Sequence, residues 1–351
     1  MKANGSFRKT LLILLSVVML IGVTPVLLAG CSNSDPKTYS LKSWDEVQST
    51  IDSARSSDII DLSKLTSPSQ QYTLSIPTNF NLAIIGNKDV DFVGVAIDCT
   101  GTNAMTIQNL HLVSTNNQHT ATISFSGWGN QLILLDDNSI INAQAAPDLG
   151  CGAAIGVSEG VTLTISGSGS LYAQAGSSAA GIGGGVGHSS GTITFREGVI
   201  TACGGDIGPE TGGAGIGGGS GGSGGATTIS GGEVYAIGGH SAAGIGGGFG
   251  GNGGAVTISG GNVTGRGGYE ASGIGRGKYG EGVVLGISGG TMTAYGTGID
   301  AIGGATPTMP GEYLWWAGGS DMNLDEPGTV YPPEAFSDYG GFSVVRIQSG
   351  K

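Results

Sequence analysis

The sequence predicts an all-β protein: a right-handed parallel β-helix, or solenoid, with a short N-terminal capping helix and a C-terminal β cap. The first observation is a repeated motif, GIGGG or a close variant, centred on Ile182, Ile216, Ile245 and Ile274. The last three isoleucines follow one another at equal intervals of 29 residues. A fixed interval of this length indicates one structural unit that is repeated, each copy contacting its neighbours.

The second observation is another motif that repeats in register with the first, as in TISGGEVYAIGG from Thr228. Its apolar residues alternate around a Gly-Gly pair, which predicts a strand, a sharp turn and a second strand. They form two columns: Phe195, Ile229, Ile258 and Ile287, then Ile200, Val234, Val263 and Met292. Together with GIGGG, each repeat has three short strands, the content of one β-helix coil. Thr227, at a strand start, is expected on the outer surface.

The third observation is the glycine content, 71 of 351 residues. Helical repeats are disfavoured because each interior glycine costs roughly 1 kcal/mol relative to alanine. Collagen is excluded because the glycines keep no strict three-residue period. Gly/Ser-rich stretches are flexible linkers by composition alone, but disorder would not preserve two apolar columns in register. Glycine suits the corners of stacked coils, where φ is positive and backbones pass closely.

Residues 1–30 resemble a bacterial lipoprotein signal peptide. Lys2, Arg8 and Lys9 precede an uncharged run that ends in Leu-Ala-Gly before Cys31. In such signals the cysteine becomes lipidated and forms the mature N-terminus. A retained membrane helix is disfavoured by Pro25 near the end of the run. We therefore expect a membrane anchor through lipid on Cys31, a tether at 31–39, and a location on the extracytoplasmic face of the cell envelope.

The β-helix is expected at 40–305, beginning with a helix that covers the open edge of the first coil. Within 39–61, apolar residues recur at helical spacing, with Ser43 as N-cap and Glu46 completing a capping box. Less regular coils precede the array. After residue 305 the composition changes to aromatic and proline-rich, which predicts a cap of two or three strands at 306–351.

Charge and cysteine content narrow the function classes. The formal net charge is −12, and loss of the signal peptide makes it more negative. An anionic surface disfavours nucleic acid as a partner. Cys99, Cys151 and Cys203 match no zinc spacing. One disulfide remains open, although buried free thiols are favoured, and no cofactor or metal is expected.

The candidate ligand-binding residues lie between Gly265 and Gly282, where charged and aromatic side chains interrupt a nearly uncharged array. They are Arg266, Tyr269, Glu270, Arg276, Lys278 and Tyr279. Aromatic rings stack on sugars while charged groups bond hydroxyls. Arg276 takes the place of Gly247 in the preceding copy, so it is expected to project from its corner. The alternative is that these residues simply keep the last coils soluble.

Catalytic residues are not assigned. A β-helix lyase needs a base near carboxylates, and a glycosidase needs carboxylates that converge on one face. Asp89, Asp91 and Asp98 form a weak carboxylate group, for which structural roles in turns are favoured.

Several motifs together carry a resemblance to a known group. A Trp-containing N-terminal helix is followed by NQLILLDDNSI, GAAIGV, LTISGSGSL and GAGIGGG. This order resembles bacterial surface proteins commonly labelled carbohydrate-binding-domain-containing, with pectate-lyase-like β-helices, over most of residues 40–305. The resemblance implies a lipid-anchored surface protein that binds glycans or surface and host macromolecules without catalysis. The alternative is a polysaccharide lyase or glycosidase on the same scaffold.

Overall fold

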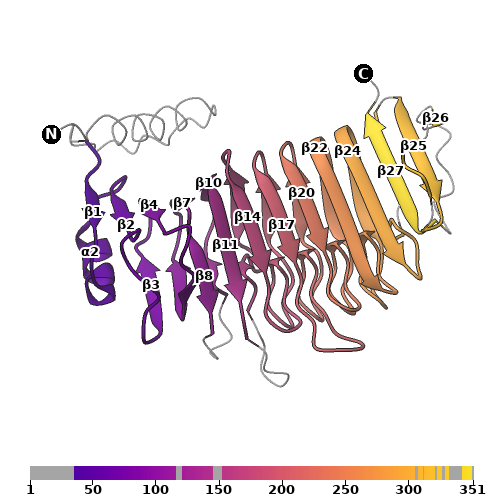
Figure 1. Ribbon diagram of the computed structural model, residues 1–351. Coiled ribbons are helices and arrows are strands. Elements are labelled where there is room, and N and C mark those ends of the chain that lie inside the picture. Colours follow the sequence, from indigo (N-terminus) through magenta and orange to yellow (C-terminus); the bar gives the residue numbers. More distant parts are fainter. Residues whose placement is uncertain are drawn as a thin grey trace. The chain divides into compact units, whose positions relative to one another are not determined.

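The computed structural model describes residues 35–115, 121–144, 152–304, 307–310, 312–320, 322–325, 329–331 and 342–349. The β-helix and its two caps belong to one compact unit, Lys37–Lys351. Its strands pair in parallel from coil to coil along the chain (Figure 1). The predicted all-β solenoid with a short helix is confirmed. The predicted signal peptide and Cys31 lie outside the described residues.

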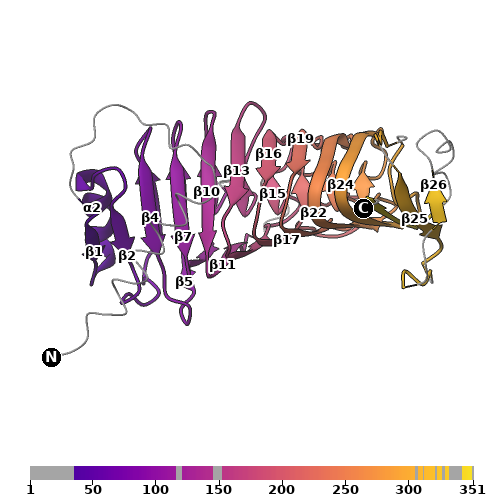
Figure 2. The same cartoon turned by 90° about the horizontal axis from the view of Figure 1, so that it is seen from above.

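Each coil contributes strands to three faces. Figure 2 shows first-face strands side by side. The first face holds β2 (Ile59–Asp61), β4 (Asn81–Ile85), β7 (Ala104–Gln108), β10 (Asn130–Leu135), β13 (Thr162–Ser166), β16 (Thr192–Phe195) and β19 (Ala226–Ile229). The second holds β5 (Phe92–Val93), β8 (His111–Ser114), β11 (Asp137–Asn142), β14 (Ser170–Gln174), β17 (Val199–Cys203) and β20 (Glu233–Ile237). The third holds β3 (Tyr72–Ile76), β6 (Val95–Cys99), β9 (Ile123–Phe125), β12 (Ile155–Gly156), β15 (Ile182–Gly183), β18 (Ile216–Gly217), β21 (Ile245–Gly246) and β23 (Ile274–Gly275).

The third face contains the isoleucine column that the GIGGG motif predicts. In register from coil to coil, it consists of Ile97, Ile123, Ile155, Ile182, Ile216, Ile245 and Ile274. Every one of these side chains is fully buried. A buried isoleucine contributes about 1.5–3 kcal/mol, so this column is a continuous part of the core.

From Ile182 onward, the residue after each isoleucine of this column is glycine, and the backbone geometry requires it. Gly217 and Gly246 have φ of 138° and 136°. Residues other than glycine rarely adopt this backbone conformation. A Cβ at Gly217 would also overlap the carbonyl oxygen of Gly246 in the next coil. Both the turn and the close backbone approach therefore select glycine here.

The other two predicted columns are also confirmed. Phe195, Ile229, Ile258 and Ile287 are in register, and so are Ile200, Val234, Val263 and Met292. In the last two coils the first and second faces join into single bent strands, β22 (Gly254–Tyr269) and β24 (Val283–Thr297). Thr227 is a correction. It lies in register with Ile193 and Val256, inside the core, and is 3% exposed.

Early coils turn their corners with buried asparagines instead of glycine pairs. Asn103 and Asn130 are 2% and 1% exposed. The Oδ1 of Asn130 accepts from the N–H of Asn103 at 3.1 Å, and the Oδ1 of Asn103 accepts from the N–H of Phe80 at 3.0 Å. Each side chain thus satisfies a buried backbone donor of the preceding coil.

The N-terminal cap consists of β1 (Thr38–Ser40), the short 3-10 helix η1 (Trp44–Glu46) and the helix α2 (Val47–Ser53). Ser43 is the N-cap as predicted, its Oγ accepting from the N–H of Asp45 at 3.3 Å. The predicted capping box with Glu46 does not form, because the N–H of Glu46 donates to the backbone carbonyl of Ser43 instead. The helix is shorter than segment 39–61 because both ends of that segment form strands: β1 pairs with β2. β1 also begins two residues before the predicted boundary at 40. Val47 and Ile51 of α2 are fully buried against the first coils.

The described residues of the C-terminal cap form three antiparallel strands, β25 (Tyr313–Gly318), β26 (Thr329–Tyr331) and β27 (Val344–Ser349). β27 pairs antiparallel with β24, the last strand of the array. The hydroxyl of the buried Tyr313 donates to the carbonyl of Ile287 at 2.8 Å. Within the described ranges, no helix is long and apolar enough to cross a membrane.

Candidate functional site

Two chain segments bring four of the six predicted binding residues to one place. Tyr269 ends β22 and Glu270 follows it, whereas Lys278 and Tyr279 lie in the loop between β23 and β24. Because β23 is only two residues long, the loops before and after the third-face strands lie against each other. The N–H of Lys278, in the loop after β23, donates to the carbonyl of Ser241, in the loop before β21, at 3.0 Å.

Lys278 is the centre of the cluster. Its Nζ lies 3.3 Å from Oε1 of Glu210 and 3.2 Å from Oε2 of Glu270. Its side chain is 12% exposed, so the cation is held by protein partners more than by water. A cation held by two carboxylates fixes the loops that carry them. Solubility alone does not account for this arrangement.

Two tyrosine rings flank this cation. The Nζ of Lys278 lies 4.8 Å from the ring centroid of Tyr279 and 5.6 Å from that of Tyr269. The hydroxyl of Tyr279 donates to Oε1 of Glu210 at 3.2 Å. Tyr269 and Tyr279 are nevertheless 51% and 67% exposed. We call Glu210, Tyr269, Glu270, Lys278 and Tyr279 the tyrosine ledge: two open rings on a rigid charged base.

The ion pairs shift two pKa values in opposite directions. Hydrogen bonds to Tyr279 and to Glu270 raise the pKa of Lys278, and its burial opposes them. The hydrogen bond from Lys278 lowers the pKa of Glu270. Both shifts favour the charged pair, so the ledge keeps its charges at neutral pH.

Tyr279 occupies a backbone position that is glycine in the two preceding coils. Hydrogen bonds align it with Gly250 and Gly221, whose φ values are 73° and 81°. Tyr279 adopts the same conformation, with φ of 68°. Non-glycine residues with positive φ are uncommon and often mark functional sites.

Three residues of this region were missed by sequence reasoning: Glu210, His240 and Phe249. The Tyr279 ring meets Phe249 edge-on at 5.8 Å, and the Tyr269 ring lies 5.6 Å from His240. Glu210 had a sequence signal. The interval from Ile182 to Ile216 exceeds 29 residues because the loop containing Glu210 is longer than its counterparts.

The two predicted arginines lie outside the ledge. Arg276 aligns with Gly247 as predicted, but it does not project freely: it is half-buried and its Nη1 donates to the carbonyl of Gly280 at 3.3 Å. Arg266 is exposed on the second face. Its guanidinium lies over the Tyr295 ring at 4.8 Å, and Nη1 contacts the Tyr235 hydroxyl at 3.4 Å.

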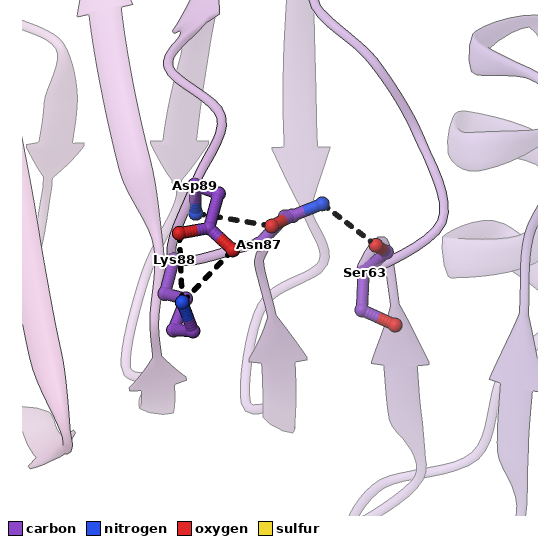
Figure 3. A network of polar contacts seen from close by, with 4 residues as sticks. All are labelled: Ser63, Asn87, Lys88 and Asp89. Atoms are coloured by element: carbon purple, nitrogen blue, oxygen red, sulfur yellow. Dashed lines mark hydrogen bonds and ion pairs between the residues drawn. The ribbon is translucent and has the colours of Figure 1, made fainter.

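The three aspartates of the weak carboxylate group have separate partners. Asp89 pairs with Lys88 at 2.7 Å, in a turn that Asn87 ties to Ser63 (Figure 3). Asp91 faces His111 at 3.7 Å. On β6, Asp98 accepts from the hydroxyl of Ser124 at 2.5 Å. These contacts agree with the structural roles that the sequence favours.

Cys99 and Cys203 are free thiols. Burial raises the pKa of both, which disfavours the reactive thiolate. Cys151 lies outside the described residues. In the part of the chain that the structure describes, no three His, Cys, Asp or Glu residues are grouped as a metal site would require.

Compared with protein-family models, with curated proteins and with solved structures, the chain gives no match. What the molecule can bind must therefore be inferred from its own residues.

Proposed function

We propose that this protein is a lipid-anchored cell-surface β-helix that binds glycans or surface macromolecules without catalysing a reaction. The observation that carries the proposal is the pair of exposed rings on the tyrosine ledge, 51% and 67% exposed over a cation that two carboxylates hold in place. Exposed aromatic faces beside fixed polar groups are suited to sugar rings, which present both apolar faces and hydroxyls.

The rigidity of the ledge supports the proposal. Binding loses less entropy when side chains are already ordered. Here the Lys278 side chain contacts two carboxylates and both rings, and its backbone is bonded to neighbouring coils. Asp89, Asp91 and Asp98, the weak carboxylate group, each contact a different partner.

Glycan retention tests the binding. The chain from residue 32 onward is applied to a glycan array and to envelope extracts, beside a Tyr269→Ala, Tyr279→Gly double variant. Glycine at 279 restores the residue of the aligned coils, so this change should not strain the fold. We expect at least a tenfold loss of retention, with Tyr172→Ala as the control because Tyr172 is also exposed, at 40%, but lies on β14. Unchanged retention, or release of reducing ends from the glycan, would contradict the proposal.

The anchor has a separate test. Expression with residues 1–31 intact should give a membrane-bound chain whose mass corresponds to lipid on Cys31. A Cys31→Ala variant should lose that mass. Recovery of an unlipidated product that retains residues 1–30 would refute the anchor while leaving the binding proposal open.

A further inference from the structure

A shallow, open groove runs along the corner that precedes the first-face strands, beside the loop that carries Lys278 and Tyr279: the N–H of Glu281 in that loop donates to Oδ1 of the groove residue Asn252 at 2.8 Å. Its volume is about 470 Å³, and it extends from Glu159 and Gly160 across several coils to Asn252 and Gly254. Among the described residues that line it, Glu159 alone is charged. The remaining lining is serine, threonine, asparagine, alanine and glycine, an uncharged surface that mixes hydrogen-bonding groups with apolar ones.

One polar side chain per coil forms a ladder along this groove. The Oγ of Ser189 accepts from the N–H of Ser223 at 3.1 Å, and the Oγ of Ser223 accepts from the N–H of Asn252 at 3.4 Å. These bonds fix the side chains. A serine hydroxyl that accepts a backbone bond still has its own hydrogen to donate, so the ladder offers regularly spaced donors.

Trp128 stands beside the N-terminal end of the groove. Its neighbours hold it next to Thr162: the N–H of Thr162 donates to Gly127 at 3.2 Å, and the N–H of Gly129 donates to Thr162 Oγ1 at 2.6 Å. Thr162 is in register with Thr192, which lines the groove. The turn is therefore well fixed, but the indole is 75% exposed. A large apolar ring so open to solvent is suited to stacking on a partner.

On the first face next to the groove, one threonine recurs in each coil. Thr164, Thr194, Thr228 and Thr257 are in register on the outer side of the first face. Successive strands lie about 4.8 Å apart, close to the rise of one pyranose residue in an extended chain. A linear polymer of sugars lying along the axis could therefore meet similar groups at successive units.

We propose that this groove, with Trp128 at its end, is a second binding site that takes an extended neutral glycan lying along the β-helix axis. One sugar ring stacks on the indole, and hydroxyls of the following units bond to Ser189, Ser223 and Asn252. Anionic glycans are disfavoured by Glu159 and by the net charge of −12. The inference takes its ligand class from the groove and rests on the proposed binding function only in that both concern glycans.

Affinity electrophoresis tests the site with gels that contain hydroxyethylcellulose, galactomannan or, as the anionic probe, polygalacturonate. We expect retardation of the chain from residue 32 onward in at least one neutral gel and none in the anionic gel. Trp128→Ala should lower the affinity at least tenfold, and Asn252→Ala should lower it less. Tyr172→Ala should leave it unchanged. Circular dichroism and melting temperature confirm that each variant is folded.

The outcomes separate this inference from the proposed function. Retardation that Trp128→Ala leaves intact, but that Tyr279→Gly abolishes, would overturn the groove and support the ledge. Retardation by polygalacturonate alone would overturn the neutral ligand class. Absence of retardation in every neutral gel would also reject the groove, whereas retention on another glycan or on envelope extract would keep the proposed function.

Discussion

Ile245 and Val284 are both aliphatic residues of the last coils, but they face opposite environments. Ile245 is fully buried in the third-face column, whereas Val284 on β24 is 73% exposed. An Ile245→Asp change places an unpaired carboxylate in the core, which should lower the free energy of unfolding by several kcal/mol. The matched Val284→Asp change should stay within about 0.5 kcal/mol. Urea denaturation measures both, and equal losses would contradict the stacked column.

The ion pair between Lys278 and Glu270 predicts that the stability of the fold depends on pH. Because Lys278 lowers the pKa of Glu270 in the folded state, ionised Glu270 stabilises the fold at pH above its ordinary pKa, about 4.3. This stabilisation is lost as the pH falls through the lowered folded pKa. Glu270→Gln should therefore be less stable than the natural chain at pH 7, and the difference should shrink as the pH falls below about 4.3.

Urea midpoints at pH 7 and pH 3 check this expectation, with 1 M salt as a further condition. Salt should reduce the difference at pH 7 because the pair is partly exposed to solvent. Because the pKa of Lys278 is raised in the folded state, the stabilisation by the charged lysine should be lost as the pH rises above about 10.4. A difference that stays constant from pH 7 to pH 3 would mean that Glu270 does not stabilise through its charge.

At the scale of the element, strand β24 departs from the threonine column that runs through the preceding coils. Gly286 lies in register with Thr257 and so takes the next position of the threonine column, but a Cβ there would meet open space. Gly286→Thr should raise the free energy of unfolding by roughly 0.5–1 kcal/mol, since glycine loses more backbone entropy on folding. Gly289→Thr in the same strand should destabilise, because its Cβ would overlap the carbonyl oxygen of Ser259. Melting curves of both variants check the pair; a destabilising Gly286→Thr would contradict it.

Sequence reasoning located the columns because each coil repeats the same burial pattern. It failed where coils differ. Thr227 takes a core position that Ile193 and Val256 hold in the neighbouring coils. Its alternation with Ile229 already places it on the inward face, but its polar side chain was interpreted as exposed. The helix was limited by strand pairing between β1 and β2, a contact between distant residues. Glu210 contacts Lys278 across 68 residues of sequence. The irregular motif interval indicates a longer loop there, but it does not say which residues that loop contacts.

Only part of the tyrosine ledge could be predicted from the sequence. Tyr269, Glu270, Lys278 and Tyr279 are neighbours in sequence and in space, so local composition was sufficient to find them. Arg266 and Arg276 are equally close in sequence, but strand direction turns Arg266 to the second face, and a corner bond holds Arg276. The Trp128 groove depends on residues from several coils and had no local signal.

At the scale of the whole unit, the two ends of the stack decide whether it stays monomeric. A parallel stack leaves an unpaired strand edge at each end, which can pair with another chain. The N-terminal cap covers one end through β1, β2 and α2. At the other end β27 pairs with the second half of β24, and Thr308 bonds to Leu285 and Ile287 in the first half.

A chain that stops after Gly304 should therefore expose the β24 edge and associate. Because the N-terminal end stays covered, two copies can pair edge to edge but cannot extend further, so the expected product is a dimer and not a filament. Light scattering coupled to size exclusion should show a concentration-dependent dimer. Tyr313→Phe is the control: it removes the 2.8 Å bond to Ile287 but leaves both cap strands in place, and should remain monomeric. A monomeric truncated chain would mean that the edge is protected by other means, whereas open-ended fibres would mean that the N-terminal cap does not seal its end.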